Sequence, residues 1–204
     1  MDITLFPTKG NLILAKSRLA LSKQGYVLLD KKRIVLIREM MELIDNAKEI
    51  QSKIDSTFAR AYKALQSVNI MLGIDNVEQT SYAIPLESSI KINFRSVMGV
   101  EIPIVGSRTE KSACPYGIYS TNSALDAAYN EFENVKHLSV KLAEAENSIY
   151  RLAAAIKKSQ KRANALKNIM IPRYAKLTGD IEAALEEKER EEFARLKVIK
   201  HNAN

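Results

Sequence analysis

Glycine and proline are scarce in this chain of 204 residues, which contains seven of the first and five of the second. Residues 26–72 and residues 118–171 contain neither, so two runs of 47 and 54 residues lack the usual turn-forming residues. Seven of these twelve glycines and prolines lie in the segment from Gly73 to Gly117, both ends included. Sandwiches, barrels and doubly wound sheets need many turns, and this distribution disfavours them. It predicts two very long elements joined by a compact middle.

Other absences narrow the class of function. Tryptophan is missing, aromatic residues make up 6% of the chain, and no apolar run is long enough to span a bilayer. The first residues show no signal-peptide pattern and Cys114 has no second cysteine to pair with, so we expect a cytosolic protein. P-loop, nucleophile-elbow and C-x-x-C motifs are absent, and His137 and His201 are isolated. We therefore expect no catalytic, metal-binding or cofactor-binding residues.

The first long run has the spacing of a coiled-coil helix, with Thr8 or Asn11 as its N-cap. Ten of eleven positions at alternating three- and four-residue spacing are apolar. This seam comprises Ile37, Met40, Ile44, Ala47, Gln51, Ile54, Phe58, Ala61, Leu65, Val68 and Leu72. A weaker seam from Leu12 to Leu36 runs in a different phase, which predicts a local change of supercoil between Leu36 and Ile37.

The second long run matches the first in length and period, and residues 120–123 offer N-caps for it. Its seam comprises Val135, Leu138, Leu142, Ala145, Ile149, Leu152, Ile156, Ser159, Ala163, Leu166 and Met170. Apolar spacing resumes beyond Pro172, which predicts a kink there rather than an end. Because neither helix can bury its stripe alone, the fold class is mainly α, a long antiparallel two-helix coiled coil with a short β-hairpin in its middle region.

The middle of the chain alternates polar and apolar residues on both sides of Met98-Gly99, which predicts a β-hairpin near residues 88–105. Pro103 cannot donate to the ladder, so its strand should lie at an edge. A lone two-stranded hairpin is marginal in water and should pack on the helices or on another protein. The predicted segments are a first helix over 1–72, the middle over 73–121, a second helix over 122–200 and a flexible tail over 201–204.

Net charge is +7, and its placement on the helices is uneven. With the two termini side by side, residues facing each other have numbers that add to about 205, and the acidic stretch 180–192 faces Lys16, Arg18 and Lys23. Basic residues then gather at one level as a basic collar: Lys31, Lys32, Arg33, Arg38, Lys157, Lys158, Lys161, Arg162, Lys167 and Arg173. The collar is either a solvated face or the contact for an acidic partner.

Gly25 lies inside the first predicted helix, where it costs about 1 kcal/mol relative to alanine. It is either a tolerated helical glycine or a point of close approach by another backbone.

Taken in order, these residues resemble the D subunit of V-type and archaeal-type ATPases/ATP synthases. The motifs that carry the resemblance are Pro7-Thr8-Lys9, Gly25 with Leu28-Leu29 and Lys31-Lys32-Arg33, Val97 to Pro103, Tyr116-Gly117 with Thr121 and Leu125-Asp126, Arg162 to Leu166, Ile171-Pro172, and Leu185 to Lys197. Tyr26, Asp30 and Ile34 depart from the residues common in that family.

The resemblance implies a non-catalytic central rotor shaft that couples ATP synthesis or hydrolysis to ion translocation. It implies contact with the catalytic and regulatory subunits of the hexamer, the small F subunit of the stalk and the funnel-shaped subunit on the membrane ring, with no nucleotide or nucleic acid bound directly. Its location would be cytoplasmic and membrane-associated only through the complex. The stalk partners would dock at the middle region, for which we expect Ile90, Ile92, Phe94, Met98, Val100, Ile102, Ile104 and Tyr116.

Other classes of function remain alternatives on the residues alone. A prefoldin-like chaperone also combines two helices with a hairpin, although it should expose apolar tips, whereas residues 186–200 are charged. A basic coiled coil that binds nucleic acid would explain the net charge but lacks aromatic platforms for single strands. A scaffold is the least specific alternative.

Overall fold

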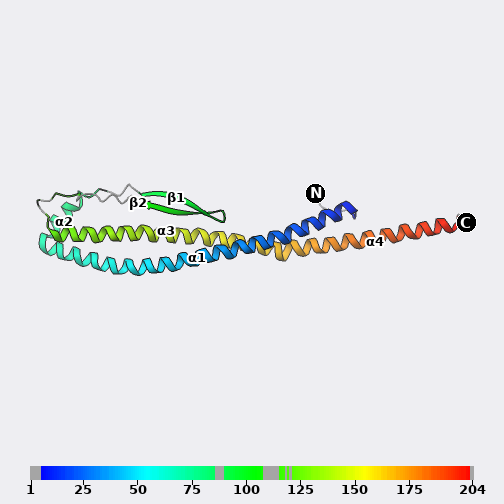
Figure 1. Ribbon diagram of the computed structural model, residues 1–204, viewed down its shortest axis with the longest axis horizontal. Coiled ribbons are helices and arrows are strands. Elements are labelled where there is room, and N and C mark those ends of the chain that lie inside the picture. The colour runs from blue at the N-terminus through cyan, green and yellow to red at the C-terminus, as the bar shows by residue number, and fades with distance from the viewer. Residues whose placement is uncertain (1–5, 86–89, 108–114, 118, 120, 203–204) are drawn as a thin grey trace. The chain divides into compact units, whose positions relative to one another are not determined.

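The computed structural model describes residues 6–85, 90–107, 115–117, 119 and 121–202. Its elements are α1 (Lys9–Leu72), α2 (Ile74–Ser81), β1 (Ile90–Val97), β2 (Val100–Ser107), α3 (Ser123–Ala165), the π-helical segment η2 (Leu166–Met170) and α4 (Ile171–Asn202) (Figure 1). The predicted fold class is confirmed: two long helical stretches flank a small antiparallel hairpin. Helix α2 was not predicted, and Cys114 lies outside the described residues.

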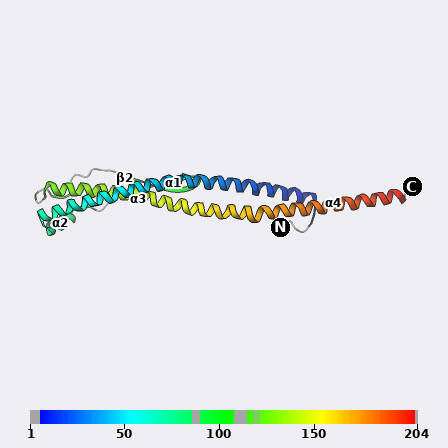
Figure 2. The same cartoon turned by 90° about the horizontal axis from the view of Figure 1, so that it is seen from below.

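The chain divides into two compact units that each combine parts of both helical stretches. The first unit takes residues up to Val35 together with those from Ile156 onward, and the second unit is Leu36–Ala155. Within each unit the two helices run side by side in both views (Figures 1 and 2).

In the first unit, α1 begins at a defined cap. The backbone N–H of Asn11 donates to Thr8 Oγ1 at 3.2 Å, which makes Thr8 the N-cap. Ion pairs join Lys9 to Glu189 at 3.0 Å and Lys16 to Glu182 at 2.6 Å, so α1 and α4 are antiparallel.

These contacts correct the predicted register. Numbers of facing residues add to 198 at Lys16 and Glu182 and to 193 at Arg33 and Gln160, rather than to 205. Lys167 therefore lies beside Tyr26, and not beside residues 32–38. Lys9, the first residue of α1, pairs with Glu189, and the residues of α4 beyond Glu189 extend past the start of α1. The chain ends are thus not aligned, as the prediction had assumed.

The helix changes its winding immediately before Pro172. The Ile171 N–H donates to the carbonyl of Leu166, five residues earlier, which is the bond of a π turn. In a regular α-helix the ring of Pro172 would clash with the carbonyl of Asn168, four residues before it. Asn168 lies in the π segment, whose wider turn leaves room for the ring. Pro172 lies at a level of α1 between Lys16 and Tyr26, whereas the predicted sum of about 205 would place it near Leu36 and Ile37.

In the second unit, the turn between the helices is closed by a small core. Asn122 caps α3, because its Oδ1 accepts the N–H of Leu125 at 3.1 Å. Val68, Tyr116, Leu125 and Ala128 form a buried cluster there.

The seam along α1 keeps one phase, so the change of supercoil predicted between Leu36 and Ile37 is not found. Leu36 is fully buried, whereas Ile37 and Gln51 are exposed. Thr57 is buried because its hydroxyl donates to the Lys53 carbonyl at 2.7 Å, and an apolar pattern overlooks such a residue. Uninterrupted 3-4 spacing joins positions that are buried or half-buried: residues 12, 15, 19, 22, 26, 29, 33, 36, 40, 43, 47, 50, 54, 57, 61, 64 and 68.

The hairpin has a two-residue turn with positive φ at both positions, 50° at Met98 and 74° at Gly99. This is the type I′ geometry that matches strand twist, and it sets a one-to-one register from Val97↔Val100 to Ile90↔Ser107. As predicted, the hairpin packs on the helices: Ile102 is buried, and the N–H of Val105 donates to Glu144 of α3 at 3.0 Å.

Candidate functional site

Most of the basic collar lies in the first unit, with only Arg38 in the second. The collar side chains that are exposed to solvent are Lys31, Arg38, Lys157, Lys158, Lys161, Arg162, Lys167 and Arg173. None of these forms an ion pair with another described residue, so their positive charge is not compensated within the described part of the chain. Lys167 Nζ lies 5.9 Å from the centre of the Tyr26 ring, at cation–π distance.

Arg33 differs from the rest of the collar because it sits in the helix seam. Its guanidinium donates to Gln160 at 2.7 Å and to Asp30 at 2.8 Å. Its Nε is buried without a partner. A polar residue in a coiled-coil seam fixes register at a cost in stability. Arg33 therefore contributes to the pairing of the two helices, and its charge is little available to a partner.

Gly25 faces the first residue of the π segment. An ideal Cβ at Gly25 would lie 3.5 Å from Leu166 Cδ1, an ordinary van der Waals distance. The close neighbour is thus a side chain, and the alternative of a second backbone close to Gly25 is not found among the described residues.

A second apolar stripe on α1 was not predicted. It repeats every seven residues as exposed pairs, at heptad positions b and c on the face turned away from the seam. Its large members are Ile13, Leu14, Leu21, Val27, Leu28, Ile34 and Val35. Leu21 and Leu28 are each 68% exposed. The signal was present in the sequence as a second heptad repeat, which a search for one seam per helix overlooks.

The expected docking residues of the middle region fall into two groups. Ile102 and Tyr116 are buried within the chain's own packing, each 6% exposed, so they are not available to a partner. Val100 is half-buried. The exposed members are Ile90, Ile92, Phe94, Met98 and Ile104.

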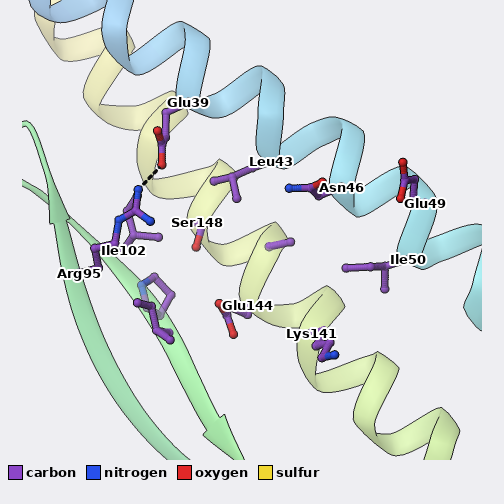
Figure 3. A pocket seen from close by; sticks show the side chains of 13 residues that line it. Glu39, Leu43, Asn46, Glu49, Ile50, Arg95, Ile102, Lys141, Glu144 and Ser148 are labelled. Atoms are coloured by element: carbon purple, nitrogen blue, oxygen red, sulfur yellow. Dashed lines mark hydrogen bonds and ion pairs between the residues drawn. The ribbon is translucent and has the colours of Figure 1, made fainter.

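A groove of about 440 Å³ lies between the hairpin and the helices of the second unit (Figure 3). Arg95 of β1 reaches across it to Glu39 of α1 at 2.6 Å, and Glu144 on α3 holds the Val105 N–H. These contacts hold the hairpin against α1 and α3, and they satisfy the side chains of Arg95, Glu39 and Glu144 at the groove. Among the described residues there is no group of three His, Cys, Asp or Glu side chains placed to hold a metal ion.

These features define a class of protein: paired long helices and a β-hairpin with exposed basic and apolar surfaces and no metal-binding cluster among the described residues. In the same part of the chain, no helix is long and apolar enough to cross a membrane.

The family model for the D subunit of ATP synthase matches residues 11–201. A V-type ATP synthase D subunit of Thermotoga neapolitana is 46% identical over 97% of this chain and 98% of its own length. A-type ATP synthase D subunits of Methanosphaera stadtmanae and Thermococcus kodakarensis are 36% and 34% identical over 96% and 95% of this chain, and 93% and 92% of their own. The chain belongs to the family of ATP synthase D subunits.

This membership confirms the resemblance and the class of function expected from it, a central-stalk subunit of a V/A-type ATPase. It also makes the other subunits of such a complex the partners of this chain. The chaperone and nucleic-acid alternatives receive no support.

Proposed function

We propose that this chain is the rotor shaft of its complex and that ATP chemistry takes place on partner subunits. The observation that carries the proposal is the match to the D-subunit family along nearly the whole chain, with the paired helices such a shaft needs. On this view the chain contributes no catalytic residue. The direction of the reaction and the choice of proton or sodium ion are properties of other subunits.

The first unit is the part that would enter the bore of the catalytic hexamer. Its exposed bases, Lys157, Lys158, Lys161 and Arg162 of α3 together with Arg173 of α4, lack internal carboxylate partners among the described residues. Acidic loops of the hexamer are the complementary surface, because unpaired like charges on one helix repel each other until a counter-charge is near. The stripe that contains Leu21 and Leu28 would supply apolar contact on the other helix.

The second unit would carry the stalk partners. We assign the docking of the small F subunit and of the funnel-shaped subunit to the exposed residues of the middle region, Ile90, Ile92, Phe94, Met98 and Ile104. The chain would then belong to the peripheral, cytoplasmic sector of the complex and contact the membrane ring only through these partners.

The test is a triple substitution, Lys158→Gln, Lys161→Gln and Arg162→Gln, in the reconstituted complex. We expect torque and coupled ATPase activity to fall several-fold, because the collar would lose its charge contacts with the hexamer. The fold should be little affected, since charges at the edge of an interface act on association and register more than on stability. The control removes the same charge elsewhere on exposed helix surface, with Lys48→Gln, Lys53→Gln and Lys63→Gln in the second unit. Equal activity of the two triple variants would show that the collar is only a solvated face.

A further inference from the structure

The two outer edges of the hairpin differ. In an antiparallel pair joined by a two-residue turn, backbone groups point alternately toward the partner strand and away from it, and Val97 and Val100, which flank the turn, face each other. Residues 101, 103 and 105 of β2 and residues 92, 94 and 96 of β1 therefore point their N–H and C=O groups outward.

On β2 two of these outward groups are occupied by side chains of α3. The Glu101 carbonyl accepts from Arg151 Nη1 at 3.2 Å, and the Val105 N–H donates to Glu144 at 3.0 Å. Between them stands Pro103, which has no N–H to leave unpaired. This edge is thus partly closed, by α3 and by proline.

On β1 the outward groups have no partner among the described residues. Side chains from Ile90 to Ser96 are all exposed, and Ile92 and Phe94 are 58% and 57% exposed. The strand pairs one-to-one over eight residues, without a bulge or a proline, so it lacks two of the usual devices that prevent strand addition. It is a regular, open edge with Ile92 and Phe94 exposed on one face.

We propose that the outer edge of β1 binds an extended acidic segment of a partner subunit by strand addition. The unpaired backbone groups select an extended chain, and the exposed face of Ile92 and Phe94 selects apolar residues at alternate positions. Lys91 of β1 forms no ion pair with another described residue, and β1 contains no acidic residue, which favours an acidic strand; Arg95 is already paired with Glu39. A second copy of β1 would bring the bases of two strands together.

This inference rests on the proposed role in the central stalk and specifies how the hairpin docks. The probe is the stalk assembled from the full chain, the F subunit and the funnel-shaped subunit, compared with the free chain by residue-resolved amide hydrogen exchange. We expect the amides of Ile92 and Phe94 to exchange about tenfold more slowly in the assembled stalk, since each gains a hydrogen bond. Unchanged exchange at both amides would overturn the proposal.

The matched variants are Ile92→Pro and Ile92→Thr. Proline removes the outward N–H and leaves the β1–β2 ladder intact, as Pro103 does at the equivalent position of β2; threonine keeps the N–H and a branched side chain. We expect Ile92→Pro to weaken assembly about tenfold relative to Ile92→Thr. Protected ladder amides at Asn93 and Arg95 verify that the hairpin remains folded.

Two further outcomes are decisive. Equal assembly of the two variants contradicts strand addition. If the free chain forms a dimer in sedimentation and Ile92→Pro abolishes that dimer, the edge of β1 binds a second copy of the chain and not an acidic segment of another subunit. In either case a chain that still co-purifies with the ATPase subunits retains its proposed function, whereas loss of co-purification from the unmodified chain defeats the function itself.

Discussion

The two compact units bury different kinds of side chain. Of the described residues in the first unit, the buried ones are Ala15, Ser159, Ala163, Thr178 and Ile181, and all but the last are small. The second unit buries Leu36, Val68 and Leu152 completely and adds a hairpin and aromatic pairs, such as Tyr62 with Phe132.

Small seam residues let two helices pack with little apolar volume between them, whereas large residues and a further layer bury more area. The first unit thus gains less from its own packing and leaves a second apolar stripe on α1 in solvent. We infer that the second unit is stable through its own packing, whereas the stability of the first unit depends more on surfaces supplied by partners.

Truncation of a fully buried side chain in the second unit should have the greatest effect on stability. Leu152→Ala removes a fully buried side chain and should lower the free energy of unfolding by about 2–5 kcal/mol. Leu19→Ala, at a half-buried seam position of the first unit, is the control and should cost less. Urea unfolding followed by circular dichroism measures both. A loss at residue 19 as large as that at residue 152 would remove the distinction between the units.

Replacement of a helical glycine in the first unit should change stability by a smaller amount. Gly25→Ala should raise the free energy of unfolding by about 1 kcal/mol, because the new Cβ meets Leu166 at an ordinary contact distance and helix propensity improves. Gly179→Ala, which meets nothing within 4 Å, should gain a similar amount. Thermal melts of both variants provide the measurement. If Gly25→Ala lowers stability while Gly179→Ala raises it, the helices need a glycine where residue 25 faces Leu166.

The smallest effect concerns the ion pairs of the first unit. Glu182→Gln breaks the pair with Lys16 and should cost at most about 1 kcal/mol, because both side chains are exposed to solvent. The loss should shrink in about 1 M salt, where charges are screened within a few ångströms. Glu187→Gln, whose partner Arg190 lies on the same helix, is the control. A salt-insensitive loss would assign Glu182 a role in packing instead.

Much of the helix pairing could be predicted from residue type and spacing. Every seam position named from Val135 to Met170 is buried or half-buried, and so are Tyr174, Leu177, Ile181 and Leu185 beyond Pro172. The prediction was weaker for α1, where Thr57 enters the seam by satisfying its hydroxyl locally. The strand alternation and the Met98-Gly99 turn also predicted the hairpin, since both depend on neighbouring residues alone.

The candidate sites were predicted less completely. Lys158 and Arg162 were predicted as members of the basic collar and are exposed on α3, but the collar residues expected beside them on α1 depended on a register that was wrong. Ile102 and Tyr116 were expected at a docking surface, and they pack inside the chain. Alternation shows which residues share a face of a strand, but it does not show which face a helix will cover.

The two helices, most of their seams and the hairpin could thus be read from residue order, because helix and strand periods follow from local backbone geometry. The register of α1 on α4, the placement of Gly25 against η2 and the edge of the hairpin that contacts α3 could not. These depend on contacts between residues far apart in the chain, such as Lys16 with Glu182 and Val105 with Glu144. No local pattern contains that information, because many registers bury the same apolar stripe.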